Sequence, residues 1–211
     1  VAIPLLLFLK LGLMGECTGI TFIDSTRIPV CENKRQSRNR VFKGYAQKGK
    51  STMGWYYGFK LHLLCNERGE LLNFALTRAN VDDRNPKVFN DLTKDLFGKL
   101  YADKGYISQS LFASLFDRGV HIVTGIRTNM KNRLMDVHDK IMLRKRSIIE
   151  TINDMLKNVA QIVHTRHRSI SNFIVNLLAG IAAYAFYDTK PSINMEFERE
   201  EKQGVKQLTL F

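Results

Sequence analysis

The sequence lacks the features that mark secreted, zinc-binding or repetitive proteins. Its three cysteines, Cys17, Cys31 and Cys65, are odd in number and without the paired spacing of a zinc site, so we expect free thiols in a reducing compartment. The opening residues 1–13 lack a charged leader and a cleavage pattern, so no signal peptide is expected. Internal repeats and low-complexity linkers are also missing. These absences favour one sizeable domain in the cytoplasm.

A membrane span is disfavoured as well. Residues 170–187 form a long apolar run, but it contains Asn172 and Asn176, and no second span or membrane flank accompanies it. We therefore expect this run to be a buried helix, and we expect no membrane partner.

Basic residues are what the sequence has in excess. There are 32 Lys and Arg against 20 Asp and Glu, a net charge of +12. The excess is clustered, since residues 27–50 hold eight basic side chains and one acid, and residues 127–168 hold ten against four. Clustering of this kind favours a nucleic-acid partner over a uniformly solvated basic surface.

The apolar pattern alternates between strand and helix signals along the chain. We predict strands at residues 20–23, 55–65, 71–77, 99–102 and 121–125, and helices at 85–97, 108–118 and 142–163. Residues 27–50 show no period and are expected to form a loop. The order predicts an α/β fold with a mixed five-stranded sheet flanked by helices.

Four aromatic residues begin the second predicted strand, and they have two possible roles. Packing in the core and at the edge of the sheet is the favoured interpretation, and stacking on nucleic-acid bases is the alternative. These residues are Trp55, Tyr56, Tyr57 and Phe59.

Three acids are candidates for one site. Asp24 and Asp103 each follow a predicted strand, and Glu150 lies on the polar face of the predicted helix 142–163. Each acid alone fits a turn, a helix cap or a solvated surface, and Asp154, one turn after Glu150, competes for the third position. Together, in a basic protein, they predict a hard oxygen site for two Mg²⁺ or Mn²⁺ ions, as phosphoryl transfer on DNA requires.

Six ordered blocks of sequence resemble bacterial insertion-sequence transposases of the family numbered nine-eight-two, within the DDE superfamily with an RNase H-like fold. The blocks cover residues 17–26, 57–62, 103–108, 129–132, 150–154 and 164–169. Related transposases carry a Tyr, Arg, Glu and Lys signature, which Arg146, Glu150 and Lys157 match, while Leu143 stands where the Tyr would be.

The resemblance implies a DNA transposase that cleaves element ends and joins them to target DNA, with Asp24, Asp103 and Glu150 as catalytic metal ligands. We expect basic residues of these blocks, of the signature and of the 27–50 segment to hold double-stranded DNA. They are Arg146, Lys157, Lys104, Arg166, Arg168, Arg38, Arg40 and Lys43. A purely hydrolytic nuclease and a non-catalytic DNA-binding remnant are the alternatives, and an RNA-binding protein is less favoured.

The resemblance also divides the chain and suggests its surroundings. Residues 1–16 would be the remnant of a helical N-terminal region, because family members have more chain before the first catalytic strand, residues 17–190 the catalytic domain, and residues 191–211 a flexible tail. Pairing of two element ends implies a homodimer, and the bacterial cytoplasm near the nucleoid is the expected location. The tail resembles the short peptide that binds the replication sliding clamp, through Gln207, Leu208, Leu210 and Phe211. Packing of this hydrophobic end on its own domain is the alternative.

Overall fold

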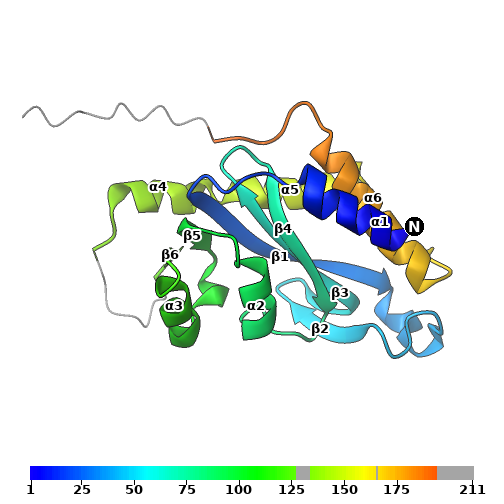
Figure 1. Ribbon diagram of the computed structural model, residues 1–211. Helices are drawn as coiled ribbons and strands as arrows, with labels where there is room; N and C mark the ends of the chain where they lie inside the picture. Colours follow the sequence, from blue (N-terminus) through cyan, green and yellow to red (C-terminus); the bar gives the residue numbers. More distant parts are fainter. Residues whose placement is uncertain (127–133, 165, 194–211) are drawn as a thin grey trace, which may run out of the picture.

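A curved mixed sheet forms the centre of the molecule, with helices on both of its faces (Figure 1). The computed structural model describes residues 1–126, 134–164 and 166–193. The strands are β1 (Ile20–Cys31), β2 (Gln47–Ser51), β3 (Gly54–Asn66), β4 (Leu71–Arg78), β5 (Gly98–Ala102) and β6 (Val120–Thr124).

The order across the sheet is β2-β3-β1-β5-β6, and β4 pairs with β3 beside β2. β3 is antiparallel to β1, β2 and β4, whereas β1, β5 and β6 run parallel. A long antiparallel hairpin beside parallel strands is the arrangement of an RNase H-like fold, so the predicted fold class is confirmed.

The helices cover two separate hydrophobic cores. The α-helices are α1 (Ala2–Phe8), α2 (Pro86–Leu92), α3 (Gln109–Phe116), α4 (Val137–Lys145), α5 (Ser147–Asp154) and α6 (Ile170–Ala185). Short 3-10 turns η2 (Asn33–Arg38) and η3 (Lys104–Tyr106) follow β1 and β5, and π-turns η1 (Leu9–Leu13) and η4 (Met155–Val159) follow α1 and α5.

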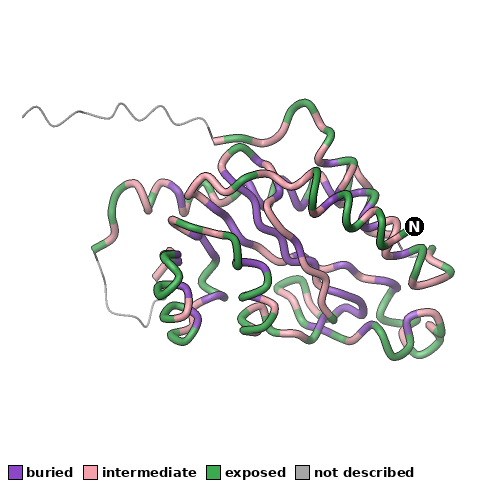
Figure 2. The backbone as a smooth tube through the Cα atoms, in the orientation of Figure 1, coloured by how far each residue is buried: buried purple, intermediate pink, exposed green. Residues whose placement is uncertain are grey.

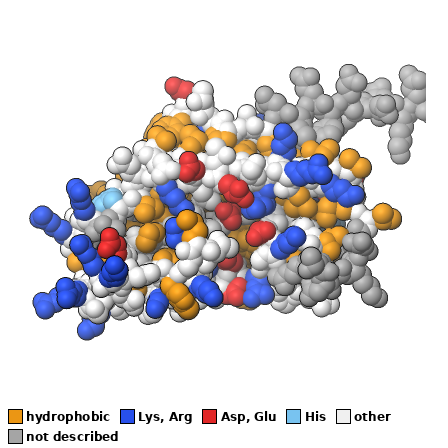
Figure 3. Space-filling view, turned by 180° about the vertical axis from the view of Figure 1, so that it is seen from behind, with side chains coloured by type: hydrophobic (Ala, Val, Ile, Leu, Met, Phe, Trp, Pro, Cys, Tyr) orange, Lys and Arg blue, Asp and Glu red, His pale blue; other side chains and the backbone are white. Residues whose placement is uncertain are grey.

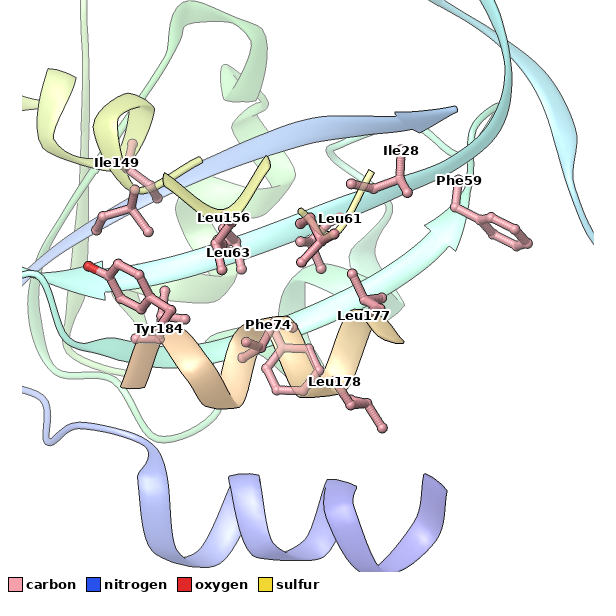
Figure 4. Close-up of a cluster of buried hydrophobic side chains, with 14 of the residues drawn as sticks. Ile28, Phe59, Leu61, Leu63, Phe74, Ile149, Leu156, Leu177, Leu178 and Tyr184 are labelled. Carbon is pink, nitrogen blue, oxygen red and sulfur yellow. The ribbon is translucent and has the colours of Figure 1, made fainter. Parts of the chain in front are cut away.

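Alternation along β1 sends its side chains to the two cores in turn. Phe22 and Ile28 face the larger core. There Leu61 and Leu63 of β3 lie against helices α5 and α6, and Tyr184 is one of the α6 side chains (Figure 4). The neighbouring Ile23 faces the smaller core against α2 and α3 instead, with buried members Leu64, Phe89, Leu100, Leu111 and Leu115. Buried residues therefore concentrate along the strands (Figure 2).

The first strand is much longer than predicted. β1 continues to Cys31, so the prediction of a strand at residues 20–23 followed by a loop at 27–50 is wrong. Pairing with β3 from Thr21 onward keeps the chain extended, and the register shift after Pro29 accommodates a residue that has no N–H to donate. Asp24 consequently lies inside a strand and not at its end.

The predicted helix at 142–163 divides into α4, α5 and the π-turn η4. Ile148, Ile152 and Leu156 are buried as the apolar stripe predicts, whereas Val159 is 62% exposed. A π-turn adds a residue to the helical turn and moves the following side chains to another face. The predicted helix at 85–97 is also too long, since α2 ends at Leu92, where Thr93 caps it by donating its hydroxyl to the Phe89 carbonyl.

The apolar run at 170–187 is the buried helix α6, as predicted, and Phe173, Leu177 and Ile181 face the core. In the described part of the chain, no helix combines the length and apolar character needed to span a membrane. Helix α1 and the turn η1 pack against α6, and Leu9 of η1 is fully buried there.

Candidate functional site

The sheet register places Asp24, within β1, and Asp103, directly after β5, at equivalent positions along neighbouring segments. Phe22 of β1 pairs with Tyr101 of the parallel strand β5, and each acid follows two residues later. The two aromatic rings stack at 5.5 Å between centroids, so both point to the larger core. Asp103 retains an extended backbone (φ −71°, ψ 160°). Since side chains repeat every second residue along extended chain, both acids are directed to the face covered by α5.

Helix α5 brings its polar residues to Asp24. The Asn153 side chain is buried and donates from Nδ2 to Asp24 Oδ2 at 3.0 Å. The Arg146 guanidinium lies 3.9 Å from Asp24 Oδ1 and donates to Glu150 Oε1 at 2.9 Å. Strand β1 and helix α5 are thereby joined through one carboxylate and two donors.

The electrostatics of Asp24 link it to the other two predicted acids. Burial raises the pKa of Asp24 from its ordinary value of 3.8 to about 6. The nearby Arg146 and the Ser25 backbone N–H oppose this rise in pKa, while the charges of Glu150 and Asp103 add to it. Ionisation of a buried carboxylate near two other carboxylates is unfavourable. A cation bound among them offsets this repulsion and favours the ionised form.

Lys157, the last residue of the predicted signature, belongs to the same environment. It lies in the π-turn η4, and burial is the main cause that lowers its pKa, followed by repulsion from Arg27. Attraction to Asp24 opposes that shift in pKa. Lys157 and Arg27 therefore add positive charge beside the acids.

The carboxylates around Asp24 and the Asn153 amide offer the oxygen atoms that a hard cation binds. The carboxylates are not placed closely enough to act together as its ligands. Within residues 1–126, 134–164 and 166–193, no three His, Cys, Asp or Glu side chains are grouped closely enough to hold a metal ion. Glu150 is 57% exposed and turned to Arg146. Asn153 Oδ1 is buried without a hydrogen-bond partner beside Asp24, an oxygen of the kind that Mg²⁺ accepts.

Asp154, the competitor for the third position, points elsewhere. Its Oδ1 accepts a hydrogen bond from the Asn158 side chain on the exposed side of the helix. The charge of Glu150 is among the causes that raise the pKa of Asp24. The environment of Asp24 favours Glu150 as the third acid.

Asn153 is a site residue that the sequence reasoning did not identify. The helical spacing groups it with Glu150 and Asp154 on a polar, solvated face. In the structure it is 6% exposed, because α5 rotates it toward the sheet, one helical turn from the core residues Ile149 and Leu156. A polar residue flanked by core positions was the available signal.

The other predicted DNA-binding residues form a second basic region, which we call the basic end. Arg38, Arg40 and Lys43 are exposed beyond the far end of β1. The ring centroid of Phe42 lies 6.5 Å from that of His167 and 5.4 Å from that of Phe173. This packing brings exposed Arg166 and Arg168 to the same end. Figure 3 shows Lys and Arg side chains gathered there.

The basic end is separate from the acids. From Asp24 to Cys31 the strand advances seven residues, or about 23 Å at 3.3 Å per residue. Lys104, in contrast, directly follows Asp103, and its stem lies over Gly125. The predicted clamp-binding residues Gln207, Leu208, Leu210 and Phe211 lie outside the described residues, as does the block at 129–132.

Comparison with known proteins adds an independent observation. Residues 14–170 match the family described as Transposase DDE domain. Among solved structures, the piggyBac transposase in its synaptic complex with hairpin DNA is similar, with a TM-score of 0.52 at 11% sequence identity. That likeness covers 82% of this chain and 47% of the other, so the chain spans about half the length of that transposase. At this identity it shows the fold alone. No curated protein matches the sequence.

Proposed function

Because the chain belongs to the family of transposase DDE domains, we propose that it is a metal-dependent DNA transposase whose catalytic carboxylates are Asp24, Asp103 and Glu150. The observation that carries the proposal is the environment of Asp24, whose pKa is raised by burial and by the charges of the other two acids. The reaction is hydrolysis at an element end, followed by attack of the freed 3′-hydroxyl on a target strand.

Two Mg²⁺ or Mn²⁺ ions held by the three carboxylates would lower the pKa of the attacking water or hydroxyl and stabilise the leaving oxygen. The protein's own residues prepare this site. Asn153 fixes the orientation of Asp24 through a hydrogen bond, and Arg146 holds Glu150 in the same way while no metal ion is bound. Arg146, Lys157 and Lys104 supply positive charge for the phosphates that flank the reacting bond.

A strand-transfer assay tests the proposal. A donor duplex with a labelled, pre-cleaved element end is incubated with a target plasmid and Mg²⁺ or Mn²⁺. Joining of the label to the plasmid supports the transposase. Nicking without joining indicates a hydrolytic nuclease, and binding with neither product indicates a non-catalytic DNA-binding protein.

The family also implies partners and surroundings, which belong to the same proposal. Two copies would act together on paired DNA ends, in the bacterial cytoplasm near the nucleoid. Residues 17–190 would be the catalytic domain, and the tail at 191–211 would reach the sliding clamp. The basic end would hold duplex DNA about 23 Å from the acids, or about seven base pairs at 3.4 Å each.

Replacing Asn153 by Ala should slow metal-dependent cleavage by about 10- to 100-fold, the usual cost of losing a partner that orients a metal ligand. Without the Asn153 donor, the pKa of Asp24 should rise further, so the pH–rate profile should move to higher pH. The measurement is the cleavage rate against pH and against Mn²⁺ concentration. Asn158→Ala, on the exposed side of η4, is the matched control and should leave both unchanged; an unshifted profile in Asn153→Ala would contradict the role.

Neutralising the basic end should weaken DNA binding without changing the chemical step. We compare the slope of the logarithm of the association constant against the logarithm of the salt concentration. In the triple variant Arg38→Ala, Arg40→Ala and Lys43→Ala, the magnitude of this negative slope should decrease by about 2.7, or about 0.9 for each lost phosphate contact. The measurement is duplex binding by anisotropy at several salt concentrations. The control removes three exposed lysines elsewhere, Lys87, Lys94 and Lys140. Equal slopes for the two variants would show that the basic end makes no specific contribution.

A further inference from the structure

One of the four aromatic residues at the start of β3 lies outside the core. Tyr56, Tyr57 and Phe59 are buried, which confirms the favoured interpretation for them. Trp55 is 54% exposed at the edge of the sheet, so burial does not account for it. Its position opposite Lys50 near the turn of the β2–β3 hairpin places it beyond the core.

Two lysines of β2 surround the exposed indole. The Lys48 Nζ lies 5.1 Å and the Lys50 Nζ 5.9 Å from the centre of the Trp55 ring. Among the described residues, neither lysine has a carboxylate within ion-pair distance. Between the lysines, Gly49 lies against the Ala79 carbonyl, where a Cβ would collide. The hairpin is thus held against the end of β4 with both ammonium groups exposed.

These side chains form one wall of a pocket of about 430 Å³. Its other walls include Lys60, Arg84 and Gly105, and Gly105 is two residues after Asp103. The pocket also contains two acids, but both are paired. Asp83 lies 2.9 Å from Lys60 Nζ, and Asp82 lies 2.8 Å from Arg84 Nη2. The uncompensated charge of the pocket therefore comes from Lys48 and Lys50.

We propose that this pocket, which we call the Trp55 pocket, binds a single DNA strand, with one base stacked on the indole and the adjoining phosphates held by Lys48 and Lys50. The proposal rests on the proposed function only for the choice of DNA as the polymer. An exposed indole with adjacent cations suits an unstacked base, because every base has an aromatic face and every nucleotide a phosphate. Bases within a duplex already stack on each other and cannot use it.

The lysines beside the ring do not block such a base. An exposed contact between an ammonium group and an aromatic ring is weak, whereas a base stacks on the ring with a larger contact area. A base that approaches the indole can displace the ammonium groups, which then reach the phosphates on either side. Gly105 in the lining is two residues from Asp103, so the bound strand would be an unpaired element end or a displaced flanking strand.

Trp55 is the only tryptophan of the protein, so its fluorescence reports on this pocket alone. The full chain is titrated, in EDTA, with a 12-nucleotide single-stranded DNA and with the matching duplex. We expect the single strand to quench the fluorescence strongly and the duplex to quench it weakly. Binding of labelled single-stranded DNA without quenching would overturn the proposal, as would stronger quenching by the duplex.

Variants separate stacking from charge. Trp55→Ala should weaken single-strand binding about tenfold, while Trp55→Phe should retain most of it, since a phenyl ring still stacks. Lys48→Ala with Lys50→Ala should decrease the magnitude of the salt dependence of single-strand binding by about 1.4 on the log–log slope, or about 0.7 for each phosphate. Lys94→Ala with Lys140→Ala, which lie outside the pocket, is the control with the same charge loss. Equal affinity of Trp55→Ala and the unchanged protein would overturn the proposal.

The test does not depend on catalysis. Because binding is measured in EDTA, a protein that neither nicks nor joins DNA can still show the Trp55 signal. An active transposase can likewise lack it. A matched RNA strand is included, and quenching by RNA with none by DNA would overturn the proposal.

Discussion

Asp24→Asn is expected to abolish metal-dependent DNA cleavage and, at the same time, to stabilise the metal-free protein. A metal ion supplies several kcal/mol of stabilisation to the transition state, and about 1.4 kcal/mol corresponds to a factor of ten. Loss of an essential ligand should therefore slow cleavage by about 10³-fold or more. The measurement is single-turnover cleavage at saturating DNA and Mn²⁺.

The gain in stability follows from the pKa of Asp24. A rise in pKa from 3.8 to about 6 on folding corresponds to about 3 kcal/mol, which the folded state loses when the carboxylate is ionised. The folded form binds more protons than the unfolded form between these pH values. The contribution of Asp24 to stability is thus fully present below about pH 4, declines between pH 4 and 6, and is absent above.

Urea unfolding in EDTA at pH 4 and pH 8 tests this expectation. Asp24→Asn should match the unchanged protein at pH 4 and exceed its free energy of unfolding by about 1–3 kcal/mol at pH 8. Asp154→Asn, which removes an exposed carboxylate nearby, should be neutral at both. A less stable Asp24→Asn at pH 8 would mean that Arg146 and Asn153 fully compensate the buried charge.

Glu150→Gln should reduce cleavage by about 10²- to 10³-fold, whereas Asp154→Asn should leave it within a factor of two. The two acids are one helical turn apart, but Glu150 adds to the raised pKa of Asp24 and accepts a hydrogen bond from Arg146, whereas Asp154 accepts one from Asn158. Cleavage rates of the two variants at several Mn²⁺ concentrations provide the measurement. The reverse ranking would assign the third position to Asp154 and would leave Glu150 as a surface partner of Arg146.

Both substitutions should leave the fold intact, which makes activity the informative readout. Glu150 is 57% exposed, and its ion pair with Arg146 is of a type that contributes little to stability. Melting temperatures of Glu150→Gln and Asp154→Asn should agree closely. A large loss of stability in Glu150→Gln alone would indicate a structural role instead.

The sequence alone was sufficient for the fold class and for most of the strands. The alternation that predicts strands at 55–65, 71–77, 99–102 and 121–125 is set by burial on two faces of a sheet, and each of these strands is present within one or two residues. The same reasoning identified the buried helix at 170–187. The acids Asp24, Asp103 and Glu150 were chosen by type and order, and the shared environment around Asp24 supports their grouping.

Tertiary structure decided what depends on partners distant in sequence. β1 extends to Cys31 because β3 lies beside it, and no local pattern records that pairing. Asn153 is buried because Asp24 accepts its hydrogen bond across 129 residues of chain, and Trp55 is exposed because its strand runs beyond the core. Periodicity reports the average burial of a segment, whereas the contacts of one side chain are fixed by long-range packing. The sequence by itself therefore determined the fold class, most of the strands and the candidate acids. The tertiary structure decided how Asp24 is oriented and which aromatic and basic side chains are exposed.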